Sequence, residues 1–377
     1  MCRIAMISAH GSPLAQPGVR ETGGMNVYVR ELSRALGRRG MEVDVYVRRT
    51  EPEAPEVESF GENARLIRIA AGAVGPVEKV AVLDHLPEFV GRVIRFARIN
   101  CIQYQYVHSH YWLSGWAGNL LAWLWGLPHL VMFHTLALLN KEDMTDNVEI
   151  PRRIEDERQV FATADALVAA TEHERDALVQ HYGADRGRIT VIPCGVDLDH
   201  FQPQDRLAAR RTLDLRPEDE VVLFVGRFDP LKGLDVLLEA MALLDARPHL
   251  RLLAAGGDPE DAELPRLRQT VKRLGIQRRV HFLGAVPQAV LPTYYAAADV
   301  CVMPSAYESF GLVAVESLAC GTPVVATKVG GLPTVVREGQ NGLLVTPRTP
   351  VAFARKIEQV LTDAELRARL RAWARAS

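Results

Sequence analysis

Short runs of apolar and β-branched residues alternate with longer stretches of helical periodicity along the whole chain. Uninterrupted apolar runs between helices are typical of parallel strands that are covered on both faces. In the first half the runs occupy residues 3–9, 43–48, 66–70, 106–110, 129–134, 166–171 and 189–194. In the second half they occupy residues 221–226, 250–256, 280–284, 300–304 and 323–327. The pattern predicts an α/β protein built on doubly wound parallel sheets.

The stretches between these runs have the periodicity of amphipathic helices. In residues 24–40, for example, apolar residues stand at Val27, Leu32, Ala35 and Leu36, and Gly40 provides a stop signal. A polar, proline-containing segment near residues 195–219 separates the two series of strands.

This division predicts two Rossmann-like domains, residues 1–196 and residues 197–377, with a linker near 195–219. In such sheets ligands bind beyond the carboxyl ends of the strands. We therefore expect the two domains to face each other across a cleft that holds the ligands.

The composition supports two domains and argues against several classes of protein. A chain of 377 residues exceeds what one hydrophobic core usually supports, and 48% hydrophobic and 24% charged residues are ordinary for a globular protein. The 44 lysines and arginines nearly balance the 46 aspartates and glutamates. With a net charge of −2 and no polybasic tract, we expect no nucleic-acid partner.

The cysteines and the N-terminus favour a cytoplasmic protein. The five cysteines are scattered and form no CxxC pair, which is typical of buried thiols in a reducing compartment. The first residues, MCRIAMISAHG, enter a strand pattern directly and lack the layout of a secretory signal.

One segment, residues 112–133, contains no Asp, Glu, Lys or Arg over a length that could span a bilayer. Because Gly126 and Pro128 interrupt it, we predict a buried helix at about 114–125 and a strand at about 129–133. The alternatives are a membrane span or, since four of the five tryptophans cluster here, a peripheral membrane contact.

The loop after the first predicted strand contains Gly23 and Gly24, at the turn into a helix. A glycine pair there lets backbone amides approach a phosphate closely, although such a pair is also common in ordinary turns. The glycines at 11, 18, 23 and 24 do not have GxGxxG spacing, which argues against a nicotinamide-dependent dehydrogenase.

Two cations leave the first strand of the second half together, in the segment GRFDPLKG. Arg227 offers a planar fork and Lys232 a point charge, and together they could neutralise a diphosphate. The alternative is a pair of solvated loop charges.

The segment ESFGLVAVE places Glu308 just before a predicted helix and Glu316 about one turn inside it. The free amides of a helix N-terminus form an anion site, here from Phe310, Gly311, Leu312 and Val313. Carboxylates accept hydrogen bonds in pairs, which suits the vicinal hydroxyls of a sugar or ribose. Grouped at strand ends with Gly330 and Gly331, these residues favour a ligand site over solvated glutamates.

Three histidines, His108, His110 and His134, also lie at predicted strand ends. No acidic or cysteine partner stands at zinc-like spacing, and Asp197 and Asp199 fall at the seam between domains, so we expect no metal site. His134 could donate a hydrogen bond to a sugar hydroxyl, or it could be a core histidine.

Several of these segments together resemble a known family. GGMNVYV, HSHYWLSG, FHT, VIPCGVDLDHF, GRFDPLKG, ESFGLVAVE and GTPVVAT are similar to the retaining glycosyltransferases of family 4. That family includes sucrose-phosphate synthases and the enzymes that glycosylate inositol phosphate in mycothiol synthesis. The similarity runs from about residue 3 to residue 362. It implies a GT-B fold, in which two Rossmann-like domains face each other across the active-site cleft.

The resemblance also implies a donor site and a mechanism. It implies a UDP-sugar donor, UDP-glucose or UDP-N-acetylglucosamine, retention of anomeric configuration, no cofactor and no essential metal. The residues implied to be catalytic are His134, Glu308, Arg227 and Lys232. The residues implied to bind the donor are Gly24, Arg227, Lys232, Glu308, Phe310, Gly311, Leu312, Val313 and Glu316.

For the acceptor, the resemblance implies a phosphorylated polyol or sugar. The GGMN segment favours the inositol-phosphate branch, and sucrose-phosphate synthesis from fructose 6-phosphate is the alternative within the family. The residues implied to bind the acceptor are Gly24, Asn26, Lys79, Tyr111, Thr135, Lys141 and Arg153. Which of Asn140 and Lys141 faces the acceptor is open, and relatives usually continue beyond the position of Ser377.

Outside this reaction, a UDP-sugar 2-epimerase and a non-catalytic UDP-sugar sensor are the alternatives. The expected enzyme is a monomer or a homodimer.

Overall fold

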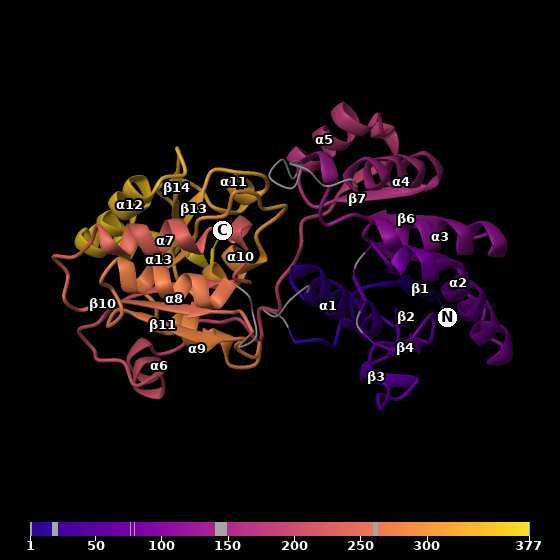
Figure 1. Cartoon of the computed structure of the whole chain (residues 1–377), viewed down its shortest axis with the longest axis horizontal. Coiled ribbons are helices and arrows are strands. Elements are labelled where there is room, and N and C mark those ends of the chain that lie inside the picture. Colours follow the sequence, from indigo (N-terminus) through magenta and orange to yellow (C-terminus); the bar gives the residue numbers. More distant parts are fainter. Residues whose placement is uncertain are drawn as a thin grey trace. The chain divides into compact units, whose positions relative to one another are not determined.

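The computed structural model describes residues 2–16, 22–75, 77–78, 80–139, 149–258 and 263–376. The chain forms two compact units (Figure 1). The first comprises Met1–Ala15 and Gly24–Pro193, and the second comprises Gln16–Gly23 and Cys194–Ser377.

The first unit is built on an eight-stranded sheet with the order β3-β4-β2-β1-β5-β6-β7-β8. Its strands are β1 Arg3–Ile7, β2 Glu42–Arg48, β3 Val57–Gly61, β4 Ala64–Ile69, β5 Tyr106–His110, β6 His129–Met132, β7 Ala166–Ala169 and β8 Ile189–Val191. Neighbouring strands are parallel except β3 and β4, which form an antiparallel pair at one edge.

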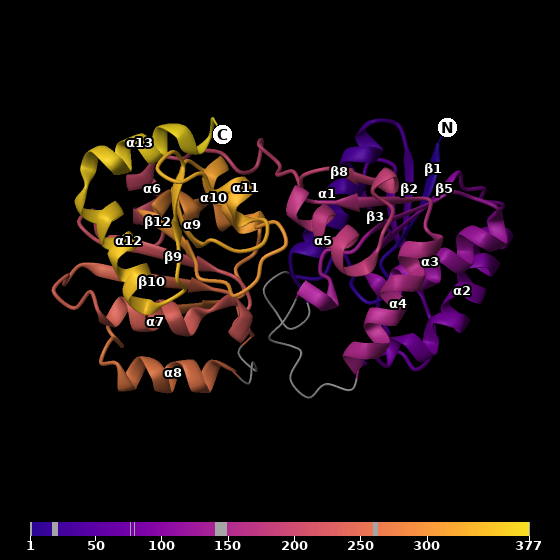
Figure 2. The ribbon, with the colours of Figure 1, turned by 90° about the horizontal axis from the view of Figure 1, so that it is seen from above.

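Helices cover both faces of this sheet, because alternate strand residues point to opposite sides. Met6 packs with Val29 of α1 on one face, and Ile7 packs with Leu86 of α2 and Leu113 of α3 on the other. Figure 2 shows α2, α3 and α4 side by side. The helices are α1 Gly24–Arg38, α2 Val82–Ile99, α3 Trp112–Trp125, α4 Glu149–Thr163 and α5 Glu172–Tyr182, with 3-10 turns η1 Ala137–Leu139 and η3 Arg186–Arg188.

The second unit has a six-stranded parallel sheet with the order β11-β10-β9-β12-β13-β14. Its strands are β9 Glu220–Val225, β10 Leu250–Ala255, β11 Val280–Gly284, β12 Val300–Met303, β13 Val324–Thr327 and β14 Gly342–Val345. Numbered from β9, this is the doubly wound Rossmann order, in which the direction of winding reverses between β9 and β12. The predicted α/β fold with two doubly wound sheets is confirmed.

Two apolar layers cover the faces of the second sheet. Phe224 faces a layer that includes Leu237 and Phe353, whereas Leu223 faces a layer that includes Tyr295 and Ala314. The helices are α6 Arg206–Thr212, α7 Leu234–Ala242, α8 Glu263–Arg273, α9 Leu291–Ala297, α10 Leu312–Ala319, α11 Leu332–Val335, α12 Pro350–Thr362 and α13 Ala364–Ala374, with a 3-10 turn η4 Pro230–Lys232.

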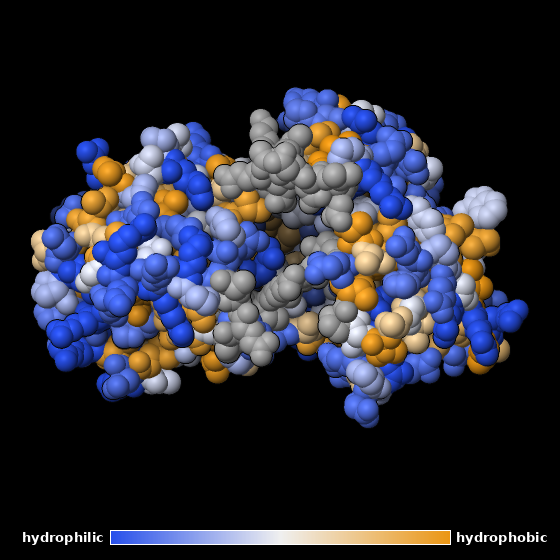
Figure 3. All heavy atoms as spheres, viewed as in Figure 1, coloured by the Kyte–Doolittle hydropathy of each residue, from blue (hydrophilic) through white to orange (hydrophobic). Residues whose placement is uncertain are grey.

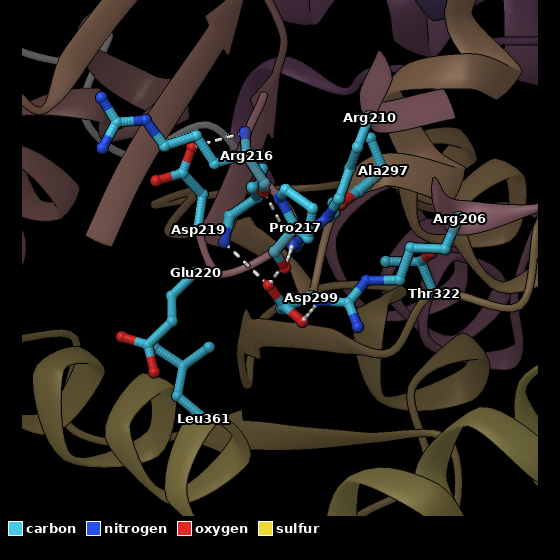
Figure 4. A network of polar contacts seen from close by, with 12 residues as sticks. Arg206, Arg210, Arg216, Pro217, Asp219, Glu220, Ala297, Asp299, Thr322 and Leu361 are labelled. Carbon is cyan, nitrogen blue, oxygen red and sulfur yellow. Dashed lines mark hydrogen bonds and ion pairs between the residues drawn. The ribbon is translucent and has the colours of Figure 1, made fainter. Parts of the chain in front are cut away.

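The segment 195–219, expected as a linker, contains α6, and a buried ion pair joins this helix to the second sheet (Figure 4). Arg210, only 1% exposed, donates to Asp299 Oδ2 at 2.8 Å and to the carbonyl of Ala297 at 3.1 Å. The same Asp299 oxygen accepts a hydrogen bond from the backbone amide of Val221, at 2.8 Å. Because removing one partner of a buried pair leaves an uncompensated charge, these contacts fix α6 to its own unit.

The charge-free segment 112–133 divides into α3 and β6, as the interruption at Gly126 and Pro128 predicts. Among the described residues, the helices are all too short or too polar to cross a membrane. Trp112 is buried, whereas Trp123 near the end of α3 is 77% exposed. On the face in Figure 3, hydrophobic residues lie in small groups among hydrophilic ones.

Candidate active site

Two loops meet at the point where the strand order of the second sheet reverses. The loop of residues 226–233 follows β9, and residues 304–311 follow the neighbouring strand β12. The next helices, α7 and α10, pack on opposite faces of the sheet. Such a reversal leaves a crevice at the carboxyl ends of the strands, where doubly wound sheets bind their ligands.

The two loops are held together by backbone contacts. The amide of Ala306 donates to the carbonyl of Leu231 at 2.8 Å. Gly233 has a φ of 71°, and a Cβ at this position would lie 2.2 Å from the carbonyl oxygen of Pro304. Only glycine fits both demands, and its small size brings the preceding residue, Lys232, against the loop after β12.

The predicted cations of this site both have carboxylate partners. Lys232 Nζ lies 2.7 Å from Glu308 Oε2, and an Arg227 guanidinium nitrogen lies 3.2 Å from Asp229 Oδ2. All four side chains are partly exposed. The structure thus brings Lys232 and Glu308 together, as the strand-end argument predicts, and the two side chains form an ion pair.

The predicted anion site at the start of α10 lies in the same loop. Gly311 is the N-cap with a φ of 101°, and the helix begins at Leu312. Within this described segment the first turn has no acidic residue and the cap has no side-chain hydrogen bond. The amides of the first turn, which include those of Leu312 and Val313, can therefore serve an external acceptor. Phe310, which precedes the cap, is buried.

Gly330 and Gly331 support this loop from the segment that follows β13. The amide of Gly331 donates to the carbonyl of Glu308 at 2.9 Å. A Cβ at Gly330, where φ is 51°, would lie 1.9 Å from that same oxygen. The glycine pair lets the chain after β13 pack against the backbone of Glu308.

Glu316 lies inside α10 and is only 6% exposed. Its carboxylate accepts hydrogen bonds from the hydroxyl of Tyr295 at 2.8 Å and from the amide of Gln288 at 3.2 Å. Burial, together with the nearby charge of Glu316, raises the pKa of Tyr295 well above its usual value. The tyrosine therefore stays protonated and donates, which fixes the direction of the carboxylate.

A second cluster lies at the carboxyl ends of β5 and β6 in the first unit. Tyr111, with a φ of 77°, precedes α3, and the guanidinium of Arg153 lies 5.1 Å from the centroid of its ring. Arg153 also donates to the carbonyl of Thr135 at 3.1 Å and to its hydroxyl at 3.3 Å. Arg153 is thus in contact with two other residues that are predicted to bind the acceptor.

Glu157 holds this arginine in place and is absent from the sequence prediction. Its carboxylate is fully buried and accepts hydrogen bonds from Arg153 Nε at 2.8 Å, from the amide of Ala137 and from the hydroxyl of Tyr182. The four-residue spacing of Arg153 and Glu157 on one helix is the sequence signal that could have found it.

His134 follows β6 and adopts a φ of 64°. Its Nε2 lies 3.0 Å from Nδ1 of His110, and the ring of Tyr28 stands edge-on to it at a centroid distance of 5.1 Å. Burial lowers the pKa of His134 to about 3, so the ring is neutral at neutral pH. A neutral imidazole has one N–H donor and one acceptor nitrogen, and either can form a hydrogen bond with a hydroxyl.

The remaining predicted residues have different positions. Gly24 is the first residue of α1. Asn26 is 2% exposed, and its side chain donates to the carbonyl of Ser12 at 2.9 Å, so it ties the loop after β1 to the helix. Lys79 and Lys141, like Asn140, lie outside the described residues.

Within the described ranges, no three His, Cys, Asp or Glu side chains are grouped so that they could hold a metal ion. Asp197 and Asp199, at the seam, form a turn in which Asp197 Oδ1 accepts from the amide of Asp199 at 3.0 Å and from that of His200 at 3.2 Å.

Comparisons with known proteins agree with this geometry. Residues 22–200 match Glycosyltransferase Family 4, and residues 205–377 match Glycosyl transferases group 1. The D-inositol 3-phosphate glycosyltransferase of Corynebacterium glutamicum (strain R) is 41% identical to this chain. The alignment of 377 positions covers 98% of this chain and 90% of that protein.

Among solved structures, sucrose-phosphate synthase from Thermosynechococcus elongatus superimposes with a TM-score of 0.92 and 36% identity, covering 100% of this chain and 94% of that one. HepE of Anabaena in complex with UDP-glucose has a TM-score of 0.78 at 22% identity, with 100% and 94% coverage. The second likeness concerns the fold alone.

Fold and site define a glycosyltransferase of the GT-B fold class, as predicted. The chain belongs to glycosyltransferase family 4.

Proposed function

We propose that this glycosyltransferase transfers a hexosyl unit from a UDP-sugar to a phosphorylated polyol such as inositol phosphate. The second domain binds the donor, UDP-glucose or UDP-N-acetylglucosamine, and the first binds the acceptor. The relative from Corynebacterium glutamicum, which is named for D-inositol 3-phosphate, supports this acceptor class.

The donor proposal rests on the reversal point of the second sheet. Arg227 and Lys232 hold the diphosphate, together with the amides at the start of α10, while Glu316 binds the ribose. Glu308, already paired with Lys232 at 2.7 Å, contacts the hexose. HepE, which shares this fold, was solved with UDP-glucose. Charge that develops on the departing diphosphate is stabilised by the cations and by the helix N-terminus.

The observation that carries the acceptor proposal is the position of Arg153. Its guanidinium contacts Tyr111 and Thr135 and is oriented by the buried Glu157. A guanidinium held between a phenol and a hydroxyl can bind a phosphate through several charge-assisted hydrogen bonds. Gly24, Asn26, Lys79 and Lys141 complete the proposed acceptor set.

In the proposed reaction, a hydroxyl oxygen of the acceptor attacks the anomeric carbon of the donor sugar. The bond between that carbon and the diphosphate oxygen breaks at the same time. The leaving phosphate oxygen takes the proton of the acceptor hydroxyl. The acceptor attacks the face of the sugar that the diphosphate leaves, and the anomeric configuration is therefore retained. His134 donates a hydrogen bond to the donor sugar near the reacting carbon. No metal takes part, because the cations and amides serve the leaving group.

Sucrose-phosphate synthesis is the second candidate, since sucrose-phosphate synthase is 36% identical over the whole chain. A matrix of UDP-glucose and UDP-N-acetylglucosamine against inositol phosphate and fructose 6-phosphate distinguishes the two. We expect glycosyl transfer to inositol phosphate, with UDP released in equal amount. Transfer only to fructose 6-phosphate would favour the second candidate. Donor conversion without an acceptor would indicate an epimerase, and UDP-sugar binding without turnover would indicate a sensor.

A further inference from the structure

Two histidines at the ends of adjacent strands of the first unit are joined by a hydrogen bond. His110 is the last residue of β5, and its Nδ1 lies 3.0 Å from Nε2 of His134, which follows β6. His110 is fully buried. The positive φ of His134 is unfavourable for a residue with a side chain, so the surrounding structure must hold it there.

Aromatic contacts restrict both rings. Tyr28, from α1, stands edge-on to His110 and His134 at centroid distances of 5.7 Å and 5.1 Å. The centroids of the His108 and His110 rings are 4.3 Å apart. These ring contacts restrict the orientation of both imidazoles at the strand ends.

Either of the two histidines could donate the proton of this hydrogen bond. Burial lowers the pKa of both histidines, that of His134 to about 3, so each ring is neutral and carries one proton. If His134 donates from Nε2, the proton of His110 must be on its Nε2. If His110 donates from Nδ1, the proton of His134 must be on its Nδ1.

The other nitrogen of His110 distinguishes these arrangements. Its Nε2 is buried and has no hydrogen-bond partner in the described part of the chain. The first arrangement would leave a buried N–H without an acceptor, which is rare in proteins, whereas the second leaves only a bare lone pair. The second arrangement is therefore favoured.

We propose that His110 is a positioning residue of the transferase, which donates to Nε2 of His134 and holds that ring in its Nδ1–H tautomer. The proposal deepens the proposed function and rests on it, because in that function His134 donates to the donor sugar. The hydrogen bond determines which nitrogen of His134 carries the donating proton, as second partners of functional histidines commonly do.

A matched pair of variants tests the role of the bond. In His110→Asn the side-chain amide can replace the Nδ1 donor, whereas His110→Leu has nearly the same shape as the Asn variant and no donor. We expect His110→Leu to lower kcat about tenfold with little change in the KM of the acceptor, and His110→Asn to keep kcat within about threefold of wild type. Equal kcat in the two variants would overturn the proposal.

The tautomer itself is measured on the whole wild-type enzyme. Long-range 1H–15N spectra with labelled histidine distinguish protonated from bare ring nitrogens, and His134→Gln identifies the signals of His134. We expect a protonated Nδ1 and a bare Nε2, and a protonated Nε2 would overturn the proposal even if the Leu variant does not fold. These spectra need no acceptor, so failure of the proposed function is seen separately, as absence of transfer by wild type.

Discussion

Lys232 and Glu308, 76 positions apart in the sequence, form an ion pair with a distance of 2.7 Å between Nζ and Oε2. The pair joins the loops that follow β9 and β12, where the strand order of the second sheet reverses. In the proposed function the lysine holds the diphosphate and the glutamate contacts the hexose. The donor then binds to side chains that already orient each other.

Removing the lysine should impair transfer. We expect Lys232→Ala to lower kcat roughly 10²–10³-fold, because a group that stabilises charge in the transition state is lost. Steady-state rates with a UDP-sugar and inositol phosphate measure the effect. The matched control is Lys272→Ala, which removes an exposed lysine on α8. A Lys232→Ala enzyme with the wild-type rate would show that the lysine has no part in the reaction.

Glu308, the glutamate of the pair, should be needed for transfer but not for the binding of UDP. Glu308→Gln keeps the size of the side chain but removes the charge that holds Lys232, so UDP should bind at least as tightly as to wild type. Transfer should still fall, because the hexose contact is altered. Calorimetry with UDP measures the affinity. A loss of UDP affinity in Glu308→Gln would contradict the roles assigned here.

Glu316 should be needed for the nucleotide, and its partner Tyr295 for stability. Glu316→Ala removes the proposed ribose ligand, so UDP affinity should fall. It also leaves the buried Tyr295 hydroxyl without its acceptor, so the free energy of unfolding should fall by about 1–3 kcal/mol. Tyr295→Phe keeps the carboxylate, and its UDP affinity should stay near that of wild type. Calorimetry and denaturant unfolding separate the two effects. Equal loss of UDP affinity in both variants would mean that Glu316 acts only by packing.

Arg153 should act on the acceptor alone. We expect Arg153→Ala to raise the KM of inositol phosphate about tenfold or more, the usual effect of losing a hydrogen bond to a charged group, with little change in donor affinity. Arg152→Ala, which removes the exposed neighbour on α4, is the control. If instead the KM of the donor changed and that of the acceptor did not, the domain assignment would be reversed.

Stability should fall as the solution becomes mildly acidic. Burial lowers the pKa of His108 to about 4 and that of His129 to about 3, whereas the unfolded chain binds these protons near pH 6.5. The stabilisation is therefore complete above pH 6.5 and is lost progressively below it, by about 1.4 kcal/mol per pH unit for each such histidine.

Variants separate the pH dependence of stability that comes from the histidines from that of Glu174. Burial raises the pKa of Glu174 to about 7, so this carboxyl group changes stability with pH in the opposite direction. We expect His129→Gln to flatten the slope of unfolding free energy against pH between 6.5 and 5, and the exposed His249→Gln to leave it unchanged. Denaturant unfolding at several pH values gives the slopes. An unaltered slope in His129→Gln would mean that this ring is charged in the folded protein.

Much of the fold could be predicted because parallel strands buried on both faces leave continuous apolar runs. Strand β3 was not predicted, since Val57–Gly61 is an exposed edge strand whose polar residues give no such run. Strand β14, Gly342–Val345, was also missed, because it begins in an Asn-Gly pair, which is typical of a turn. Helix α10 begins at Leu312 rather than at Phe310, because Gly311 takes a φ that precedes a helix rather than continuing one.

The candidate site could be predicted as positions at strand ends but not as contacts. Lys232 and Glu308 were both expected there, yet their pairing depends on how Gly233 packs against Pro304, which no local pattern reveals. Asn26, predicted to bind the acceptor, is buried and donates to the carbonyl of Ser12, a contact that the sequence does not reveal because packing decides which way a helix residue faces.

The most direct test of the account is a crystal structure of the enzyme with UDP bound. We predict that the diphosphate oxygens lie within hydrogen-bond distance of Arg227, Lys232 and the amides at the start of α10. A diphosphate bound away from these three groups would contradict the account.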